Sequence, residues 1–172
     1  KTGGTAGAGG PSERGPGDHA LGRSRGGFTT KLHRVTDRGG LPLAVVLTPG
    51  QRHDSTQFER ALNAVGVRQR SGQTRRRPGC VLADRGYDVD RIRAWLRRKG
   101  IAAVIPSKRN RKCPRRYDRA LYRERNVVER TLGHLKEHRR IGTRHEKLAG
   151  SYRAMVQLAI MERYLREYPD SA

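Results

Sequence analysis

Four polar side chains of one predicted helix have the types and spacing that phosphoryl-transfer chemistry requires. Tyr122, Arg125, Glu129 and Lys136 lie within the segment 122–138, and at about 100° of rotation per residue they fall within about 60° of one another on the helix surface. A carboxylate flanked by cations can hold a metal ion and the phosphates that the ion contacts. The same spacing occurs on an ordinary salt-bridged helix face. The adjoining stripe is apolar and predicts the buried face: Leu121, Val128, Leu132 and Leu135.

A second carboxylate, Asp84, follows the short apolar stretch C-V-L-A at 80–83. That stretch predicts a buried strand, and catalytic groups in open α/β sheets gather at the carboxyl ends of strands. Taken alone, Asp84 is better explained as a turn or cap residue. Together with Glu129 on a later helix, it predicts a pair of carboxylates that bind Mg²⁺, with Mn²⁺ as a substitute.

The charge balance of the 172-residue chain predicts a polyanionic partner. Lysine and arginine total 38 against 16 acidic residues, and the formal net charge is +22. Charge of this size attracts nucleic acid, although a GC-rich coding sequence also produces many arginines and glycines. Two cysteines, Cys80 and Cys113, without a Cys-x-x-Cys pair predict a reduced, cytoplasmic location. No stretch reaches the ~18 apolar residues of a membrane span, so no membrane partner is expected.

The elements that must position these residues follow a recognisable order. Residues 1–27 are rich in glycine and basic side chains, which predicts a flexible segment without a strand. Order is predicted to begin at Phe28. The first predicted elements are strands at 28–35 and 41–47, a helix at 54–65 capped by Asp54 and Ser55, and an arginine-rich loop at 68–77.

The second half of the chain alternates strands and helices. A helix at 89–99 is predicted to bury Ile92, Trp95 and Leu96 and to end at Gly100. The other predicted elements are strands at 80–83 and 101–105, a basic loop at 107–116, and helices at 122–138 and 148–167. This alternation predicts an α/β fold, with one domain over residues 28–172.

The pattern Y-x2-R-x3-E-x6-K of residues 122–136 resembles the signature of the DDE insertion-sequence transposases, which have an RNase H-like fold. Further stretches resemble the same family in order: G-R-S-R-G-G-F-T-T-K-L-H (22–33), T-P-G-Q-R-H-D (48–54), L-A-D-R-G-Y-D (82–88), I-P-S-K-R-N-R-K (105–112) and R-R-I-G-T-R (139–144). The resemblance covers nearly everything from Gly22 to about Leu165.

The resemblance implies a reaction and a set of roles. The reaction is metal-dependent hydrolysis at the ends of an insertion sequence, followed by transfer of the 3′-hydroxyl to target DNA. Asp84 and Glu129 correspond to the second and third acidic residues of the family's triad, which bind the metal. Tyr122, Arg125 and Lys136 support the substrate phosphates. The partner is double-stranded DNA, both transposon ends and target, bound by a homo-oligomer.

The resemblance also implies a missing part. The family's first Asp lies on a first, central strand upstream of residues 22–27, and residues 1–27 offer no such strand; Asp18 stands in a flexible context. We therefore expect an incomplete RNase H-like mixed sheet flanked by helices, in a fragment, a frameshifted part or a decayed copy. Whether the chain alone is an enzyme stays open at this point.

Two other functions stay open beside catalysis. A catalytically inactive DNA-binding remnant would keep the charge without the reaction, and an RNA-associated structural protein would prefer structured RNA. The basic runs at 68–77 and 108–119 favour contacts with the DNA backbone. A zinc site at H-L-K-E-H (134–138) is disfavoured, because its third ligand would have to come from a short remaining tail.

Overall fold

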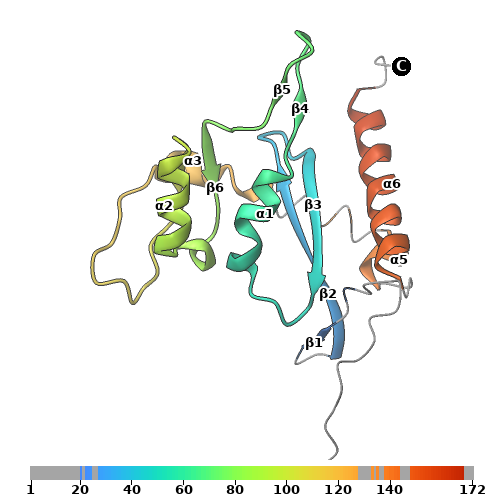
Figure 1. Cartoon of the computed structure of the whole chain (residues 1–172), viewed down its shortest axis with the longest axis horizontal. Coiled ribbons are helices and arrows are strands. Elements are labelled where there is room, and N and C mark those ends of the chain that lie inside the picture. Colours follow the sequence, from blue (N-terminus) through green and yellow to red (C-terminus); the bar gives the residue numbers. More distant parts are fainter. Residues whose placement is uncertain are drawn as a thin grey trace, which may run out of the picture.

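The computed structural model describes residues 20, 22–24, 27–127, 133, 135, 138–143 and 148–168. Strands and helices alternate along the chain, and Figure 1 shows their arrangement. The elements are β1 (Gly22–Ser24), β2 (Gly27–Thr36), β3 (Pro42–Pro49), the 3-10 turn η1 (Asp54–Gln57), α1 (Phe58–Asn63), β4 (Val67–Arg68), β5 (Thr74–Arg75), β6 (Cys80–Leu82), the 3-10 turn η2 (Arg85–Tyr87), α2 (Asp90–Arg98), β7 (Ala102–Val104), α3 (Arg119–Arg123), α5 (Arg139–Gly142) and α6 (Ala149–Glu167).

An antiparallel sheet with the order β1–β2–β3 forms first. The strands predicted at 28–35 and 41–47 are present as β2 and β3. Leu32 pairs with Leu47, and both pack against the apolar cluster of α5 and α6. α1 contacts β2 and β3, and it lies on the opposite side of this sheet from α6 (Figure 1).

β1 differs from the expectation for residues 1–27. No strand was predicted there, yet Gly22–Ser24 pairs with the start of β2 in the register Gly22↔Thr29 to Ser24↔Gly27. Its residues, glycine, arginine and serine, carry no hydrophobic pattern, so backbone pairing with β2 is the contact that defines this strand. The boundary between a flexible segment and a domain at residue 28 stays a prediction.

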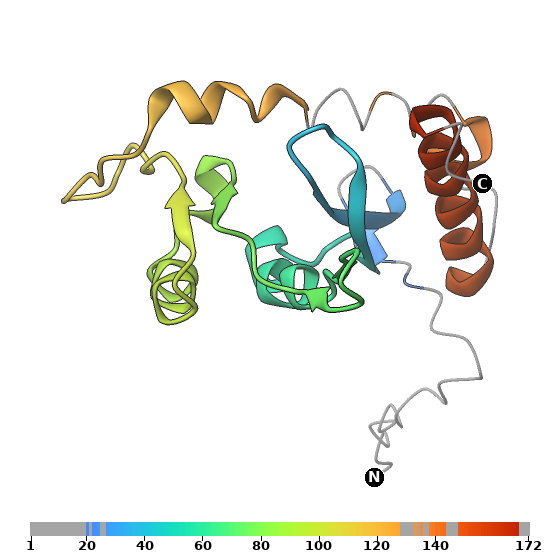
Figure 2. The same ribbon diagram turned by 90° about the horizontal axis from the view of Figure 1, so that it is seen from above.

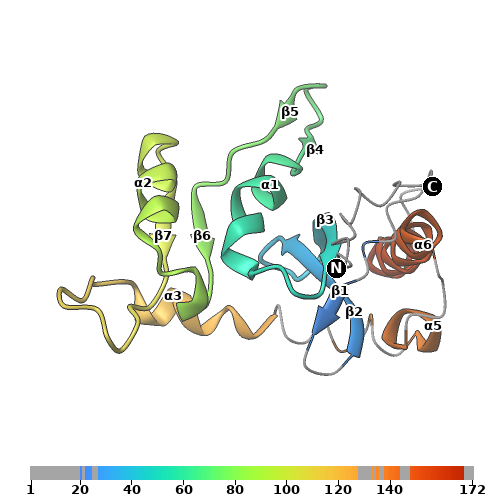
Figure 3. The same cartoon turned by 60° about the horizontal axis from the view of Figure 1, so that its bottom comes forward.

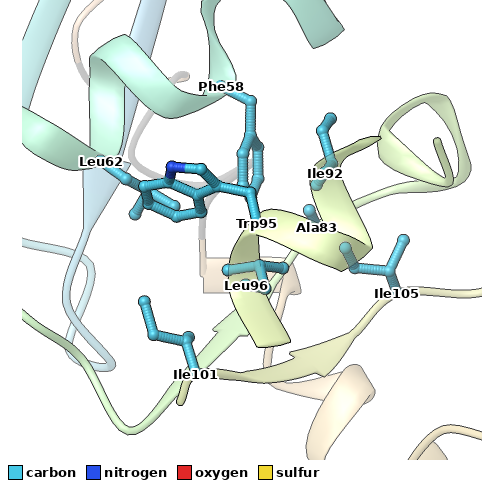
Figure 4. Packing of buried hydrophobic residues seen from close by; sticks show 8 residues of the cluster. All are labelled: Phe58, Leu62, Ala83, Ile92, Trp95, Leu96, Ile101 and Ile105. Carbon is cyan, nitrogen blue, oxygen red and sulfur yellow. The ribbon is translucent and has the colours of Figure 1, made fainter. Parts of the chain in front are cut away.

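β6 and β7 form a separate parallel pair that α2 connects. Parallel strands need such a crossover, and α2 contacts β7. α2 ends where predicted, since Gly100 has φ 64°, a left-handed conformation that glycine adopts without strain. The main core lies between these elements and α1, as Figure 4 shows. Its buried residues are Phe58, Leu62, Ala83, Ile92, Trp95, Leu96, Ile101 and Ile105.

Two local predictions are wrong. Residues 68–77 do not form a simple loop, because β4 and β5 pair as an antiparallel hairpin with Val67 opposite Arg75. Asp54 and Ser55 do not cap the following helix: η1 precedes α1, and neither has a side-chain cap hydrogen bond. The Asp54 carboxylate instead lies 2.9 Å from the Lys31 ammonium of β2. The Asp54 side chain thus pairs across to β2 instead of bonding to the backbone of the turn that it begins.

A second apolar cluster joins α6 to the β1–β3 sheet. Val156 and Tyr152 of α6 are buried in it, and the Tyr152 hydroxyl donates to the Ile141 carbonyl at 3.1 Å. The Tyr164 hydroxyl donates to the Pro42 carbonyl of β3, also at 3.1 Å. α6, at Ala149–Glu167, matches the helix predicted at 148–167 closely. Among the described residues, no helix is long and apolar enough to cross a membrane.

The architecture is mixed α/β, which confirms the predicted fold class at that level. Figure 2 shows α1 and α2 on one side of the strands and α3 on the other. Within the described part of the chain the strands form three small sheets, β1–β2–β3, β4–β5 and β6–β7.

Candidate active site

Asp84 stands at the carboxyl end of β6, where the sequence placed it. Its backbone is extended, with φ −75° and ψ 175°, and its Oδ1 accepts a hydrogen bond from the Gly86 N–H at 2.7 Å. The carboxylate therefore caps the η2 turn, which was the modest role that its position alone favoured. Asp84 is nonetheless exposed. Among the described residues, its carboxylate accepts a hydrogen bond only from the Gly86 N–H. A hard cation can still approach its other oxygen.

Gly86 fixes the orientation of this carboxylate. A Cβ at position 86 would lie 2.9 Å from Oδ1 of Asp84, closer than carbon and oxygen atoms pack without a hydrogen bond between them. Any larger residue would force the Asp84 side chain to rotate. A Cβ at position 86 would therefore displace the end of the Asp84 side chain, which is exposed and can move.

An open hollow of about 480 Å³ lies beside Asp84, and Tyr122 of α3 forms part of its wall. The Tyr122 ring meets the Tyr117 ring edge-on, with centroids 5.5 Å apart and an interplanar angle of 78°. The Arg125 guanidinium lies 5.6 Å from the Tyr122 ring centroid, within range of a cation–π contact. The full lining is Asp84, Arg85, Gly86, Pro106, Tyr117 and Tyr122.

α3 is held in this place by contacts at both ends. Asp118 caps it, because its side chain accepts a hydrogen bond from the Leu121 N–H at 2.9 Å. Just after α3, Glu124 pairs with Arg38 of the β2–β3 turn at 2.6 Å. Figure 3 shows α3 close to the end of β6. The helix predicted over 122–138 differs at both ends of this segment: α3 begins earlier, at Arg119, and ends at Arg123. A turn at residues 124 and 125 follows, so Tyr122 lies on α3 and Arg125 lies beyond it.

Glu129 and Lys136 lie outside the described residues. Of the five predicted site residues, the structure thus places three. Asp84 and Tyr122 line one hollow, and Arg125 lies against Tyr122. No group of three or more His, Cys, Asp or Glu side chains that could hold a metal occurs among the residues that the structure describes. Asp84 fits such a site as one oxygen ligand: it is exposed, oriented and next to a hollow.

Asp88 was not among the residues predicted from the sequence, although its carboxylate accepts three hydrogen bonds from other segments. Asp88 is 2% exposed. Its Oδ1 accepts a hydrogen bond from Arg93 Nε at 2.6 Å, and its Oδ2 accepts from the Lys108 N–H and from Arg111 Nε, both at 2.8 Å. Asp88 therefore connects α2 with the basic loop, residues 107–116. The feature of the sequence that could have pointed to Asp88 is its place at the end of the motif L-A-D-R-G-Y-D, four residues after Asp84.

The hydrogen bonds of Asp88 determine its protonation state. Burial by itself would raise the pKa of this carboxyl, but the Lys108 N–H and the Arg93 and Arg111 guanidinium groups lower the pKa below its ordinary value of 3.8. Asp88 is therefore a carboxylate at neutral pH. Arg111 also donates two bonds to Asp90 Oδ1, both at 2.9 Å, so the basic loop is held at two carboxylates.

Tyr87 is close enough to both Asp54 and Asp84 for their charges to affect its pKa. Burial is the main reason that its pKa rises to about 12, and the negative charges of Asp54 and Asp84 contribute to the rise. The Tyr87 ring packs against Phe58 of the main core, with centroids 5.4 Å apart. The turn that follows Asp84 therefore packs against the main core through Tyr87, while Asp84 itself lines the hollow.

Comparison with known proteins identifies the family. The chain belongs to the transposase DDE domain family, whose model matches residues 6–161. This match confirms the family that the ordered motifs predicted. No solved structure matches the chain.

Two curated relatives extend the comparison. A Burkholderia cepacia protein named as a transposase for insertion sequence element IS402 is 38% identical over 130 residues, which cover 75% of this chain and 59% of that relative. A Brucella ovis protein named as a transposase for insertion sequence element IS6501 is 36% identical over 142 residues, which cover 81% of this chain and 100% of that relative. The chain thus spans little more than half of the first relative.

Proposed function

We propose that this chain acts in DNA transposition as a DDE transposase, by metal-dependent cleavage and strand transfer of insertion-sequence DNA. The observation that carries the proposal is the shared hollow of Asp84 and Tyr122. These residues come from two different motifs of a chain that belongs to the transposase DDE domain family, and they meet on one surface. A turn residue alone would not need the aromatic wall that Tyr117 and Tyr122 form across this hollow.

Each site residue has a role in this proposal. Asp84 and Glu129 hold a divalent metal ion, which the DDE family implies in general and which we propose to be Mg²⁺, with Mn²⁺ as a substitute. Bound there, the ion would activate the attacking oxygen and stabilise the leaving one. Arg125 holds a phosphate through its planar fork and Lys136 through a point charge. Tyr122 orients a phosphate through its hydroxyl while its ring supports Arg125.

The fold proposal is an RNase H-like mixed sheet over residues 28–172. Two edges support it. Beyond its pairing with β1, the edge of β2 that faces away from β3 has no strand partner among the described residues, and the edge of β6 that faces away from β7 has none either. One further strand between them would join the antiparallel and the parallel sheets into one. The family's first strand, with the first acidic residue of the triad, has this central place.

The partners that we propose are double-stranded transposon ends and target DNA. The net charge of +22 supports a polyanion. Because transposition joins two ends, we also propose a homo-oligomer on the DNA.

The proposal is tested by nicking of supercoiled plasmid in the presence of Mn²⁺. We expect metal-dependent nicking by the unmodified chain and no detectable nicking by Asp84→Ala or Glu129→Ala, with duplex affinity unchanged in both. Glu167→Ala is the matched control, because Glu167 is an exposed carboxylate at the end of α6. Duplex binding by the unmodified chain without metal-dependent nicking would instead support the catalytically inactive DNA-binding remnant.

A further inference from the structure

The hairpin of β4 and β5 carries a positive charge that no acidic side chain in the described part of the chain balances. We call residues 66–77 the arginine ribbon: this segment contains five arginines and no acidic residue. Each of its residues is exposed. Figure 1 shows the ribbon as a narrow projection beyond α1.

The ribbon has a regular backbone although it buries nothing. Gln69 N–H donates to the Gln73 carbonyl at 2.8 Å, and Gly72 N–H donates to the Gln69 carbonyl at 2.9 Å. Gly72 has φ 81°, as the residue that closes a three-residue hairpin loop commonly does. An isolated two-stranded hairpin is only marginally stable in water. Core packing therefore does not explain why the chain keeps this projection.

No carboxylate of the described residues neutralises the ribbon. Its five arginines, Arg68, Arg70, Arg75, Arg76 and Arg77, form no ion pair there. The described hydrogen bonds of their side chains go to backbone carbonyls: Arg75 Nε donates to the Arg77 carbonyl at 3.3 Å, and Arg77 Nη1 donates to the Lys99 carbonyl at 3.2 Å. Five guanidinium groups on a thin ribbon repel one another unless an anion lies between them.

The ribbon presents cations in two opposite directions. Val67 pairs with Arg75, and Arg68 pairs with Thr74. Because paired residues point to the same face and successive residues to opposite faces, Arg75 and Arg68 extend from different faces. A flat anionic surface would contact one face only. A groove with phosphates along both walls contacts both.

We propose that the arginine ribbon is a DNA-binding arm that enters the major groove of duplex DNA. This groove is about 12 Å wide and admits a two-stranded ribbon, whereas the minor groove is about 6 Å wide. Guanidinium groups on both faces reach the phosphates of the two strands, and arginine at the tip reaches the N7 and O6 acceptors of guanine. The inference rests on the proposed function, because the duplex is the DNA on which the hollow acts.

The arm and the hollow are separate surfaces. Figure 3 shows the ribbon extending away from the molecule on the side opposite α3. The ribbon therefore holds the duplex at a distance from the chemistry, and its loss changes affinity rather than the reaction at bound DNA.

The test uses the full chain with Arg68→Gln, Arg70→Gln and Arg75→Gln combined. The matched control removes the same charge from exposed helix positions: Arg97→Gln, Arg98→Gln and Arg153→Gln. Binding to a short fluorescent duplex of mixed sequence is measured between about 50 and 200 mM salt. We expect the ribbon variant to bind roughly a hundredfold more weakly and its salt slope to fall by about 1.8, as the loss of the two phosphate contacts of Arg68 and Arg75 requires. The substitution of Arg70 at the tip removes a base contact instead. The affinity of the control variant should fall by less than about tenfold.

A footprint tests the groove directly. Bound protein should protect guanine N7 from dimethyl sulfate, and the ribbon variant should lose this protection even at saturating concentration. Equal weakening in the two variants, or N7 protection that survives the ribbon substitutions, would overturn the arm. Tighter binding of the unmodified chain to structured RNA or to anionic vesicles would overturn it as well.

Failure of the arm and failure of the proposed function give different results. If the arm is wrong but the function is right, the ribbon variant binds like the control while nicking still requires Asp84. If the function is wrong, nicking is absent or survives Asp84→Ala, whatever the ribbon does.

Discussion

The basic loop and the arginine ribbon are both strongly cationic, but the molecule treats their charges differently. The basic loop folds back on two carboxylates, and buried Asp88 accepts hydrogen bonds from both its backbone and Arg111. The arginine ribbon has no carboxylate partner among the described residues, and the described side-chain hydrogen bonds of Arg75 and Arg77 go to backbone carbonyls. Positive charge in the loop is thus part of the folded structure. In the ribbon it is left for an external anion.

Breaking the anchor of the loop has the largest expected effect on stability. Asp88→Asn removes the charge that Arg93 and Arg111 face in a buried position, and breaking such a pair costs about 3 kcal/mol or more of unfolding free energy. Urea denaturation measures it. Asp90→Asn is the control, since Asp90 is an exposed partner of the same Arg111, and its effect should be much smaller. Equal losses in both variants would mean that Asp88 is not the anchor.

Acid should release the same anchor. The folded pKa of Asp88 is lowered from 3.8, so its carboxylate contributes stability that is fully present above that value. As the pH falls below about 4 and through the lowered pKa, the unfolded state takes up the proton first and stability is lost. Unfolding free energy measured from pH 6 downward should drop more steeply for the unmodified chain than for Asp88→Asn. Parallel curves would contradict the assignment.

Gly86 connects the hollow to the anchored region, because it lies in the turn between Asp84 and Asp88. Gly86→Ala would place a Cβ 2.9 Å from Asp84 Oδ1 and rotate the carboxylate. We expect Mn²⁺ affinity to fall about tenfold, as when a supporting contact of a metal ligand is lost. Calorimetric titration with Mn²⁺ measures the change. Gly79→Ala is the matched control, since nothing lies within 4 Å of a Cβ there.

The smallest expected effect is that of the ribbon on stability. Because its side chains are exposed and lack ion pairs within the described structure, the three combined Arg→Gln substitutions should change the unfolding free energy by less than about 0.5 kcal/mol. Thermal or urea denaturation of the ribbon variant measures this. A loss comparable with that of Asp88→Asn would show that the ribbon supports the fold, and the contrast between the two basic surfaces would disappear.

Local patterns predicted much of this fold. The helix around Trp95 follows from apolar periodicity and a glycine stop, and its burial is as expected. The strand before Asp84 also forms, but its residues are half-buried rather than buried. Asp88 could not be found in this way, because its partners come from α2 and from a loop beyond β7. The ribbon lacks the alternating apolar pattern by which strands are recognised. The Ser71-Gly72 pair was its only turn signal.

The central claim is that Asp84 holds a metal ion beside the hollow, and Mn²⁺ binding tests it most directly. Free Mn²⁺ is followed by electron paramagnetic resonance while the chain is added, with duplex DNA present. We predict that Asp84→Asn weakens Mn²⁺ binding at least tenfold, whereas Glu167→Gln leaves it unchanged. Equal Mn²⁺ affinity in the unmodified chain and in Asp84→Asn would contradict the account.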